Sequence, residues 1–178
     1  DLTRVICAVL EDQHAKKSRI TLPSFNFRKS RIAGVRVTGG RLTVRDDSVF
    51  ADDPVNILRL FSEADRYDLD IHPEALRLVT QNLKLVDAKL RRNKQANRMF
   101  VEMLTGADPV KTLMRFNEAG VFGRFIPDFG RVVAQMQYDM YHVYTVDEHT
   151  MMCIAVLQEI ESGTLQEIAP IATEVVHK

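Results

Sequence analysis

The segment DDPVNILRLFSEADRYD, residues 52–68, carries a strong helical signal. An aspartate at its start can cap a helix, and Pro54 suits the first helical position because proline has no backbone N–H to satisfy. Ile57, Leu58 and Phe61 then recur at the spacing of one helix face. We therefore predict an amphipathic helix that packs this stripe into a core.

The helical pattern continues from residue 52 almost to the end of the chain. Residues 72–93 repeat the proline start and predict one helix with a core face of Leu76, Val79, Leu83 and Val86. Further helices are predicted over 94–106, 108–120, 131–143, 145–163 and 170–178, with a connector containing a Pro-Asp turn over 121–130. Three of these helices end on glycine, namely Gly106, Gly120 and Gly163.

The first third of the chain is less regular. Residues 1–17 have helical periodicity, whereas residues 18–32 have no stable period and are predicted to form a loop. Apolar residues alternate with polar ones about Gly39-Gly40, which predicts a β-hairpin over residues 34–45. An isolated hairpin is only marginally stable, so we expect it to rest on a sheet that lies upstream of Asp1.

Composition places the chain among soluble globular proteins. It has 178 residues, of which 46% are hydrophobic and 27% charged, and no stretch approaches the roughly 20 apolar residues of a membrane helix. Cys7 and Cys153 lie in apolar helical patterns, so we expect buried, reduced thiols and a cytoplasmic protein. The predicted fold class is mainly α, with five to seven helices, one small β-hairpin and a domain boundary near 127–145. The absence of an initial Met suggests an internal part of a longer protein.

Two basic segments are candidates for binding phosphate groups. They are residues 28–45 and the cluster Lys89, Arg91, Arg92, Lys94 and Arg98. No aromatic residues are interleaved with the cluster, so a solvated helix face explains it better than a nucleic-acid site. Overall, 24 basic residues balance 24 acidic ones.

The stretch MYHVYTVDEHT, residues 140–150, gathers residues of the metal-binding type. Thr145 and Glu148 fit a capping box, and Asp147 adds negative charge where the helix dipole favours it. Helix capping does not explain His149. His149 is a candidate metal ligand, with a hydrogen-bonded core histidine as the alternative, because the chain has no HExxH or Cys/His pairing around it. Asp139 and His142 could fold back towards the start of this helix.

Three segments, 1–16, 52–79 and 114–150, resemble one family: the bacterial bifunctional uridylyltransferase/uridylyl-removing enzymes that modify the PII nitrogen-signalling protein. The most distinctive part is the run from His142 to Thr150. The resemblance implies a nucleotidyltransferase domain that uses UTP, an HD-type phosphohydrolase domain that removes UMP, and ACT domains that sense glutamine. The segment after Asp53 also resembles the helical region of tRNA nucleotidyltransferases and poly(A) polymerases. An RNA- or nucleotide-binding helical module is therefore the alternative function.

The resemblance also implies a division of the chain. Residues 1–17 would follow the transferase domain, 18–50 would be the loop and hairpin, 51–140 the helical transferase-associated domain, and 141–178 the start of the HD domain. His149 would be a ligand of Mg²⁺ or Mn²⁺ in the full-length enzyme. Three further residues would contact the metal ligands without binding the metal, or would face the substrate: Asp139, His142 and Tyr144.

This chain departs from the family pattern because most of the catalytic motifs of the family are not found in it. The transferase motif would lie before Asp1, and of the HD signature only the first histidine is matched, by His149. We therefore expect no complete catalytic site and no bound metal in this chain alone. We expect no membrane or nucleic-acid partner. An incomplete HD core should expose an apolar surface, through which copies of the chain could self-associate.

Overall fold

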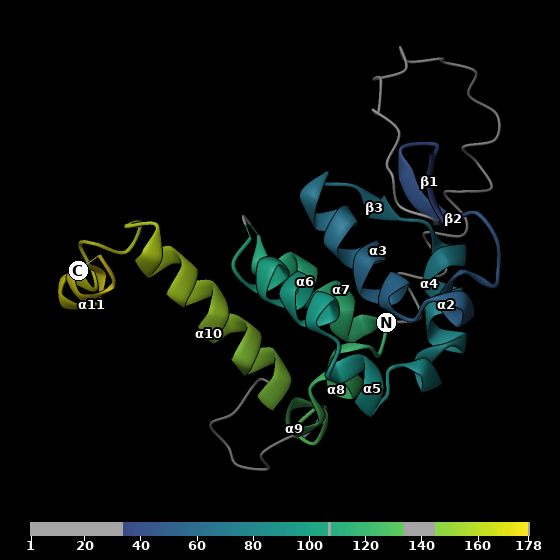
Figure 1. Ribbon diagram of the computed structural model, residues 1–178. Coiled ribbons are helices and arrows are strands. Elements are labelled where there is room, and N and C mark those ends of the chain that lie inside the picture. The colour runs from purple at the N-terminus through teal and green to yellow at the C-terminus, as the bar shows by residue number, and fades with distance from the viewer. Residues whose placement is uncertain (1–33, 107, 134–144, 178) are drawn as a thin grey trace. The chain divides into compact units, whose positions relative to one another are not determined.

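The computed structural model in Figure 1 describes residues 34–106, 108–133 and 145–177. It divides the chain into two compact units, Asp1–Met99 and Phe100–Lys178. The predicted helix over 1–17, the loop over 18–32 and most of the predicted helix over 131–143 lie outside the described residues, so these remain predictions. The domain boundary predicted near 127–145 falls largely on residues 134–144, which are also outside the described residues, and it too remains a prediction.

The predicted hairpin is confirmed. Strands β1 (Val35–Thr38) and β2 (Arg41–Val44) pair antiparallel, and Val37 stands opposite Leu42. Gly39 and Gly40 have φ angles of 58° and 78°, the left-handed region that a tight two-residue hairpin turn requires.

The hairpin does not rest on a sheet upstream of Asp1, as we expected, but on residues that follow it. Strand β3 (Asp70–Ile71) pairs parallel to β2 and completes a three-stranded sheet. Helix α4 (Pro73–Gln81) packs on β2. The hairpin therefore lies on residues that follow it in the chain. A strand of two residues is too short to show an alternating pattern, which is why the sequence did not predict it.

The helices of the first unit surround a core built mainly on α3 (Val55–Arg66). The predicted stripe of Ile57, Leu58 and Phe61 is fully buried. The other helical elements are α2 (Val49–Asp52), the 3₁₀ turn η1 (Leu83–Leu85), α5 (Ala88–Arg91) and α6 (Lys94–Leu104), which continues into the second unit.

The single helix predicted over 72–93 is wrong, because the structure breaks it into α4, η1 and α5. Asn82 donates from Nδ2 to the carbonyl oxygen of Leu78 at 2.9 Å, where α4 ends. Asp87 starts α5 by accepting backbone N–H groups through Oδ1. Of the four predicted core residues only two are buried, Val79 and Val86, whereas Leu76 and Leu83 are half-buried.

The second unit contains α7 (Pro109–Glu118), α8 (Phe122–Phe125), α9 (Pro127–Gly130), α10 (Val146–Glu161) and α11 (Pro170–Val176). Gly120 and Gly163 have φ angles of 72° and 79°, which confirms their predicted helix-end role. The connector predicted over 121–130 is instead the two short helices α8 and α9. Their aromatic side chains bury themselves in one cluster, and this packing outweighs the turn signal.

The aromatic cluster forms much of the core of the second unit. The ring of Phe100 lies with its centroid 5.3 Å from that of Phe125, and Phe122 stacks on Phe129 at 4.0 Å. Phe116 is fully buried beside them. Gly123 and Gly130 bring the backbones of α8 and α9 together, since a Cβ built on Gly130 would stand 2.3 Å from the Gly123 carbonyl oxygen.

The predicted fold class, mainly α with a small hairpin, is confirmed. The described ranges hold ten α-helices, more than the five to seven expected. One predicted helix is broken into α4 and α5, the predicted connector is helical, and α2 precedes the helix predicted from residue 52. Within these ranges, no helix is both long and apolar enough to cross a membrane.

Candidate functional site

The start of α10 forms the capping box predicted from the sequence. Thr145 is the N-cap residue in an extended conformation, and both halves of the box are present. The Oε2 atom of Glu148 accepts a hydrogen bond from the backbone N–H of Thr145 at 3.0 Å. The box satisfies two N–H groups that a helix start leaves unpaired, so it fixes the residue at which α10 begins.

His149 lies in the first turn of α10 and its side chain is exposed. Its Nδ1 atom is 3.3 Å from the Sγ atom of Cys153, one helical turn further along. Cys153 is also exposed, so the prediction of a buried thiol at this position is wrong. The alternative of a core histidine also fails for His149, because the ring is not enclosed.

Asp147 attaches the start of α10 to α7. Its side chain is buried, and its Oδ2 atom accepts a hydrogen bond from Nδ2 of Asn117 at 3.3 Å. The two helices pack against each other. The sequence predicted only a charge–dipole role for Asp147. A partner 30 positions away leaves no local pattern by which to find it.

Most of the apolar side chains of α10 that follow His149 are not buried. Met151 is buried, but Met152 and Leu157 are 47% and 61% exposed, and Ile154 and Ala155 are intermediate. Helix α10 packs on α7 through the side that carries Asp147, but Met152 and Leu157 stay exposed. Other exposed apolar residues of α10 and α11 extend this surface: Val156, Ile171, Val175 and Val176. The predicted apolar surface is therefore present.

The remaining residues singled out from the sequence near this site lie outside the described part of the chain. They are Asp139, His142 and Tyr144, together with Cys7. Among the residues that the structure does describe, no group of three or more His, Cys, Asp or Glu side chains is placed to hold a metal ion. His149 thus offers one imidazole of a centre that needs several ligands, and no reaction step follows from this geometry alone.

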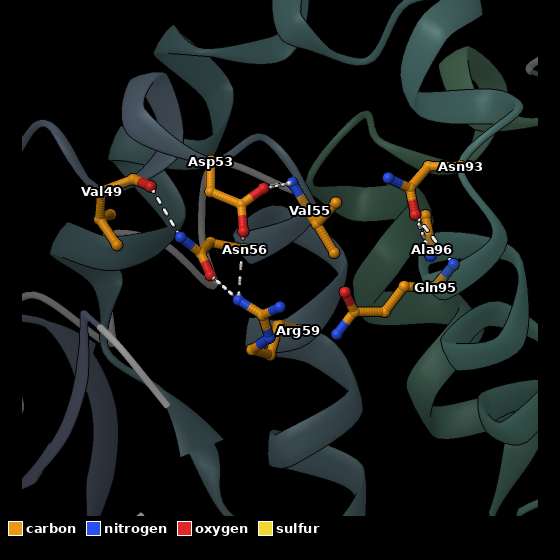
Figure 2. Close-up of polar contacts among 8 residues, drawn as sticks. All are labelled: Val49, Asp53, Val55, Asn56, Arg59, Asn93, Gln95 and Ala96. Carbon is orange, nitrogen blue, oxygen red and sulfur yellow. Dashed lines mark hydrogen bonds and ion pairs between the residues drawn. The ribbon is translucent and has the colours of Figure 1, made fainter. Parts of the chain in front are cut away.

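A second polar cluster, in the first unit, is structural (Figure 2). The buried Asn56 donates from Nδ2 to the carbonyl oxygen of Val49 at 2.9 Å and accepts a hydrogen bond from Arg59. Arg59 also lies 3.5 Å from Asp53 Oδ2, and Asp53 Oδ1 accepts from the N–H of Val55 at 3.1 Å. These contacts tie α2 to the first turns of α3.

Two further polar side chains cap helix starts. His72 accepts from the N–H of Glu74 through Nδ1 at 3.2 Å at the start of α4. Asn93 caps α6 by accepting from Gln95 and Ala96 at 2.8 and 3.1 Å (Figure 2).

The basic cluster lies on α5 and the first part of α6. Lys89, Arg92, Lys94 and Arg98 are exposed, and Arg91 is half-buried. Arg92 donates from Nε to the carbonyl oxygen of Ala88 at 3.1 Å, and Asn97 donates to the carbonyl oxygen of Arg91 at 3.1 Å. These are the contacts of a solvated helix surface, as the sequence predicted.

Comparison with known proteins gives two kinds of match. A family model described as the uridylyltransferase GlnD third domain matches residues 36–125. The chain is 52% identical over its whole length to a bifunctional uridylyltransferase/uridylyl-removing enzyme of Azospirillum brasilense. It is 46% identical to the protein of the same name in Rhodospirillum rubrum. The chain spans about a fifth of these relatives, 19% of each.

Proposed function

This chain belongs to the uridylyltransferase GlnD family, and on that premise we propose that it is the central portion of a bifunctional enzyme. The full-length protein would use UTP to uridylylate the PII nitrogen-regulatory protein and would remove the uridylyl group again, in response to glutamine. The strongest support for this proposal is that the chain is 52% identical along its length to a relative whose name includes both activities.

Within that enzyme, residues 51–140 would be the transferase-associated helices, and 141–178 would open the HD phosphohydrolase domain. Helix α10 supports this division, since a capping box marks a defined helix start at Thr145. The family model matches 36–125 and stops before this helix. The chain by itself would catalyse neither reaction, because it carries one residue of the HD signature.

We assign His149 as the HD metal ligand that this chain contributes. Two contacts and the exposure of the ring support the role. The capping box fixes the helix start, the Asn117–Asp147 hydrogen bond holds α10 on α7, and the exposed ring leaves Nε2 without a described partner. The chain thus presents an imidazole from a rigid helix end, which is what a ligand needs.

Mg²⁺ or Mn²⁺, when bound in the full-length enzyme, would supply an acidified water for attack on the phosphodiester of uridylyl-tyrosine. The described residues of this chain do not complete such a centre. Their role is to position the candidate ligand: α10 packs on α7 and holds the His149 ring in its first turn.

The alternative, an RNA-binding helical module, is not favoured by the comparisons. The matched relatives are named as uridylyltransferases and uridylyl-removing enzymes. The basic cluster on α5 and α6 also lacks the interleaved aromatic residues on which single-stranded bases stack.

The full-length protein provides the test of this function. Purified with PII and UTP, it should transfer UMP to a PII tyrosine, and with Mn²⁺ and glutamine it should release that UMP. The isolated 178-residue chain should do neither. A full-length protein without either activity on PII would refute the proposal, and so would hydrolysis by this chain alone.

A further inference from the structure

Helix α10 brings two metal-binding atoms into contact on its exposed side. The Nδ1 atom of His149 lies 3.3 Å from the Sγ atom of Cys153. Both side chains are exposed, and the spacing of four residues places them one above the other on the helix. Exposure matters here because a cation can reach the pair from solvent without opening the fold.

The separation of the two atoms is close to what a tetrahedral zinc ion imposes on its ligands. With a Zn–S bond of about 2.3 Å and a Zn–N bond of about 2.05 Å at a tetrahedral angle, sulfur and nitrogen stand about 3.5 Å apart. The pair in α10 would need to open by only about a few tenths of an ångström. Small rotations of two exposed side chains supply such a change at low cost.

The composition of the helix that carries the pair also favours a cation. The chain contains no lysine or arginine between residues 146 and 177, whereas it carries Asp147, Glu148, Glu159, Glu161, Glu167 and Glu174 there. No basic side chain of α10 or α11 therefore repels a metal ion at this surface. Glu148 is engaged in the capping box and is not counted as a ligand.

We propose that His149 and Cys153 form a two-residue chelating site for a borderline-soft divalent cation of the Zn²⁺ class. Imidazole and thiolate select such ions over Mg²⁺ and Ca²⁺, which prefer oxygen ligands. On binding, the thiol proton passes to solvent, sulfur and Nδ1 occupy two positions, and water occupies the others. This site goes beyond the proposed function and does not depend on it.

A regulatory consequence follows if the proposed function also holds. The chelate and the HD centre would both use the imidazole of His149. Zinc bound between His149 and Cys153 would then compete with hydrolysis and leave uridylyl transfer unaffected.

The direct probe is Co²⁺, which substitutes for Zn²⁺ and gives a thiolate-to-metal charge-transfer absorption. Titrating the reduced 178-residue chain should produce this band, and added Zn²⁺ should remove it. Cys153→Ser should abolish the band, and His149→Ala should weaken Co²⁺ binding by more than about tenfold. Cys7→Ser and His177→Ala are the matched controls and should leave the band intact.

Alkylation of Cys153 gives a second readout that does not depend on colour. Zn²⁺ should slow iodoacetamide modification of Cys153 in the wild-type chain, read by mass spectrometry of the peptide, and should have no effect in His149→Ala. Far-UV circular dichroism shows whether each variant keeps its helices. A variant that loses them is replaced by His149→Gln, which keeps a polar side chain but lacks the imidazole.

Three results would overturn the site: no charge-transfer band in the wild-type chain, a band that survives Cys153→Ser, or zinc protection that survives His149→Ala. None of these bears on uridylylation of PII. Failure of the zinc site and failure of the proposed function are therefore separate outcomes.

Discussion

Asn117 and Asp147, 30 positions apart in sequence, meet through a 3.3 Å hydrogen bond that joins α7 to the first turn of α10. The acceptor is buried and lies two residues before His149. The orientation of the candidate ligand thus depends on a contact with another helix as well as on its own helix start.

We expect Asn117→Ala to lower the free energy of unfolding by about 1–2 kcal/mol, because it removes a donor from a buried carboxylate. Urea unfolding followed by circular dichroism measures this change. A double-mutant cycle with Asp147→Ala should show a coupling of about 0.5–2 kcal/mol between the two positions. Strictly additive single effects would mean that the contact does not form in solution.

Thr145→Ala should destabilise the chain by about 0.5–2 kcal/mol, since it removes the capping side chain of α10. Thr145→Ser keeps the hydroxyl and should retain most of the stability, which makes it the matched control. Thermal unfolding of the three proteins provides the comparison. Equal loss in Ala and Ser variants would show that the methyl group, and not the cap, matters.

The helix-capping carboxylate of Asp87 should make the free energy of unfolding depend on pH. The backbone N–H groups of Leu90 and Lys89 hold the pKa of its carboxyl below the ordinary value. Because the folded-state pKa is depressed, the stability that the Asp87 carboxylate adds is fully present above its unfolded pKa of about 3.9. This stability is lost as the pH falls through the lower pKa of the folded state.

Asp87→Asn is the control for this effect, because asparagine also caps a helix but does not titrate. Unfolding free energies measured from pH 7 down into the acid range should fall less steeply for Asp87→Asn than for the wild type below about pH 4. Parallel curves for the two proteins would argue against a titrating cap at this position.

Gly130→Ala should destabilise the second unit by about 1–3 kcal/mol. A Cβ there would stand 2.3 Å from the carbonyl oxygen of Gly123, and backbone cannot move aside as a side chain can. The neighbouring Arg131→Ala removes only an ion pair with Asp128 between two highly exposed side chains and should change stability by less than about 0.5 kcal/mol. If both variants unfolded alike, α8 and α9 would not approach as closely as described.

Local signals predicted much of this fold. The helix start at Thr145 depends on four consecutive residues, and the hairpin turn on two glycines, so both were recognisable from sequence. The break between α4 and α5 was missed although Asn82 and Asp87 are residues that end and start helices. A continuous apolar period outweighed these two signals in the prediction.

The features that were not predictable depend on residues distant in sequence. Strand β3 exists because β2 offers it an edge, and its two residues carry no period of their own. The partner of Asp147 is fixed by the packing of α10 on α7. The contact of His149 with Cys153, by contrast, follows from a spacing of four residues on one helix and could have been predicted.

Measurements on the full-length enzyme decide whether His149 serves the hydrolase and not the transferase. The measurement is the rate of metal-dependent UMP release from uridylylated PII, beside the rate of UMP transfer to PII, for wild type, His149→Ala and the control His177→Ala. We expect His149→Ala to abolish release and largely spare transfer, while His177→Ala changes neither. Intact release by His149→Ala would show that His149 is not a ligand of the hydrolase metal.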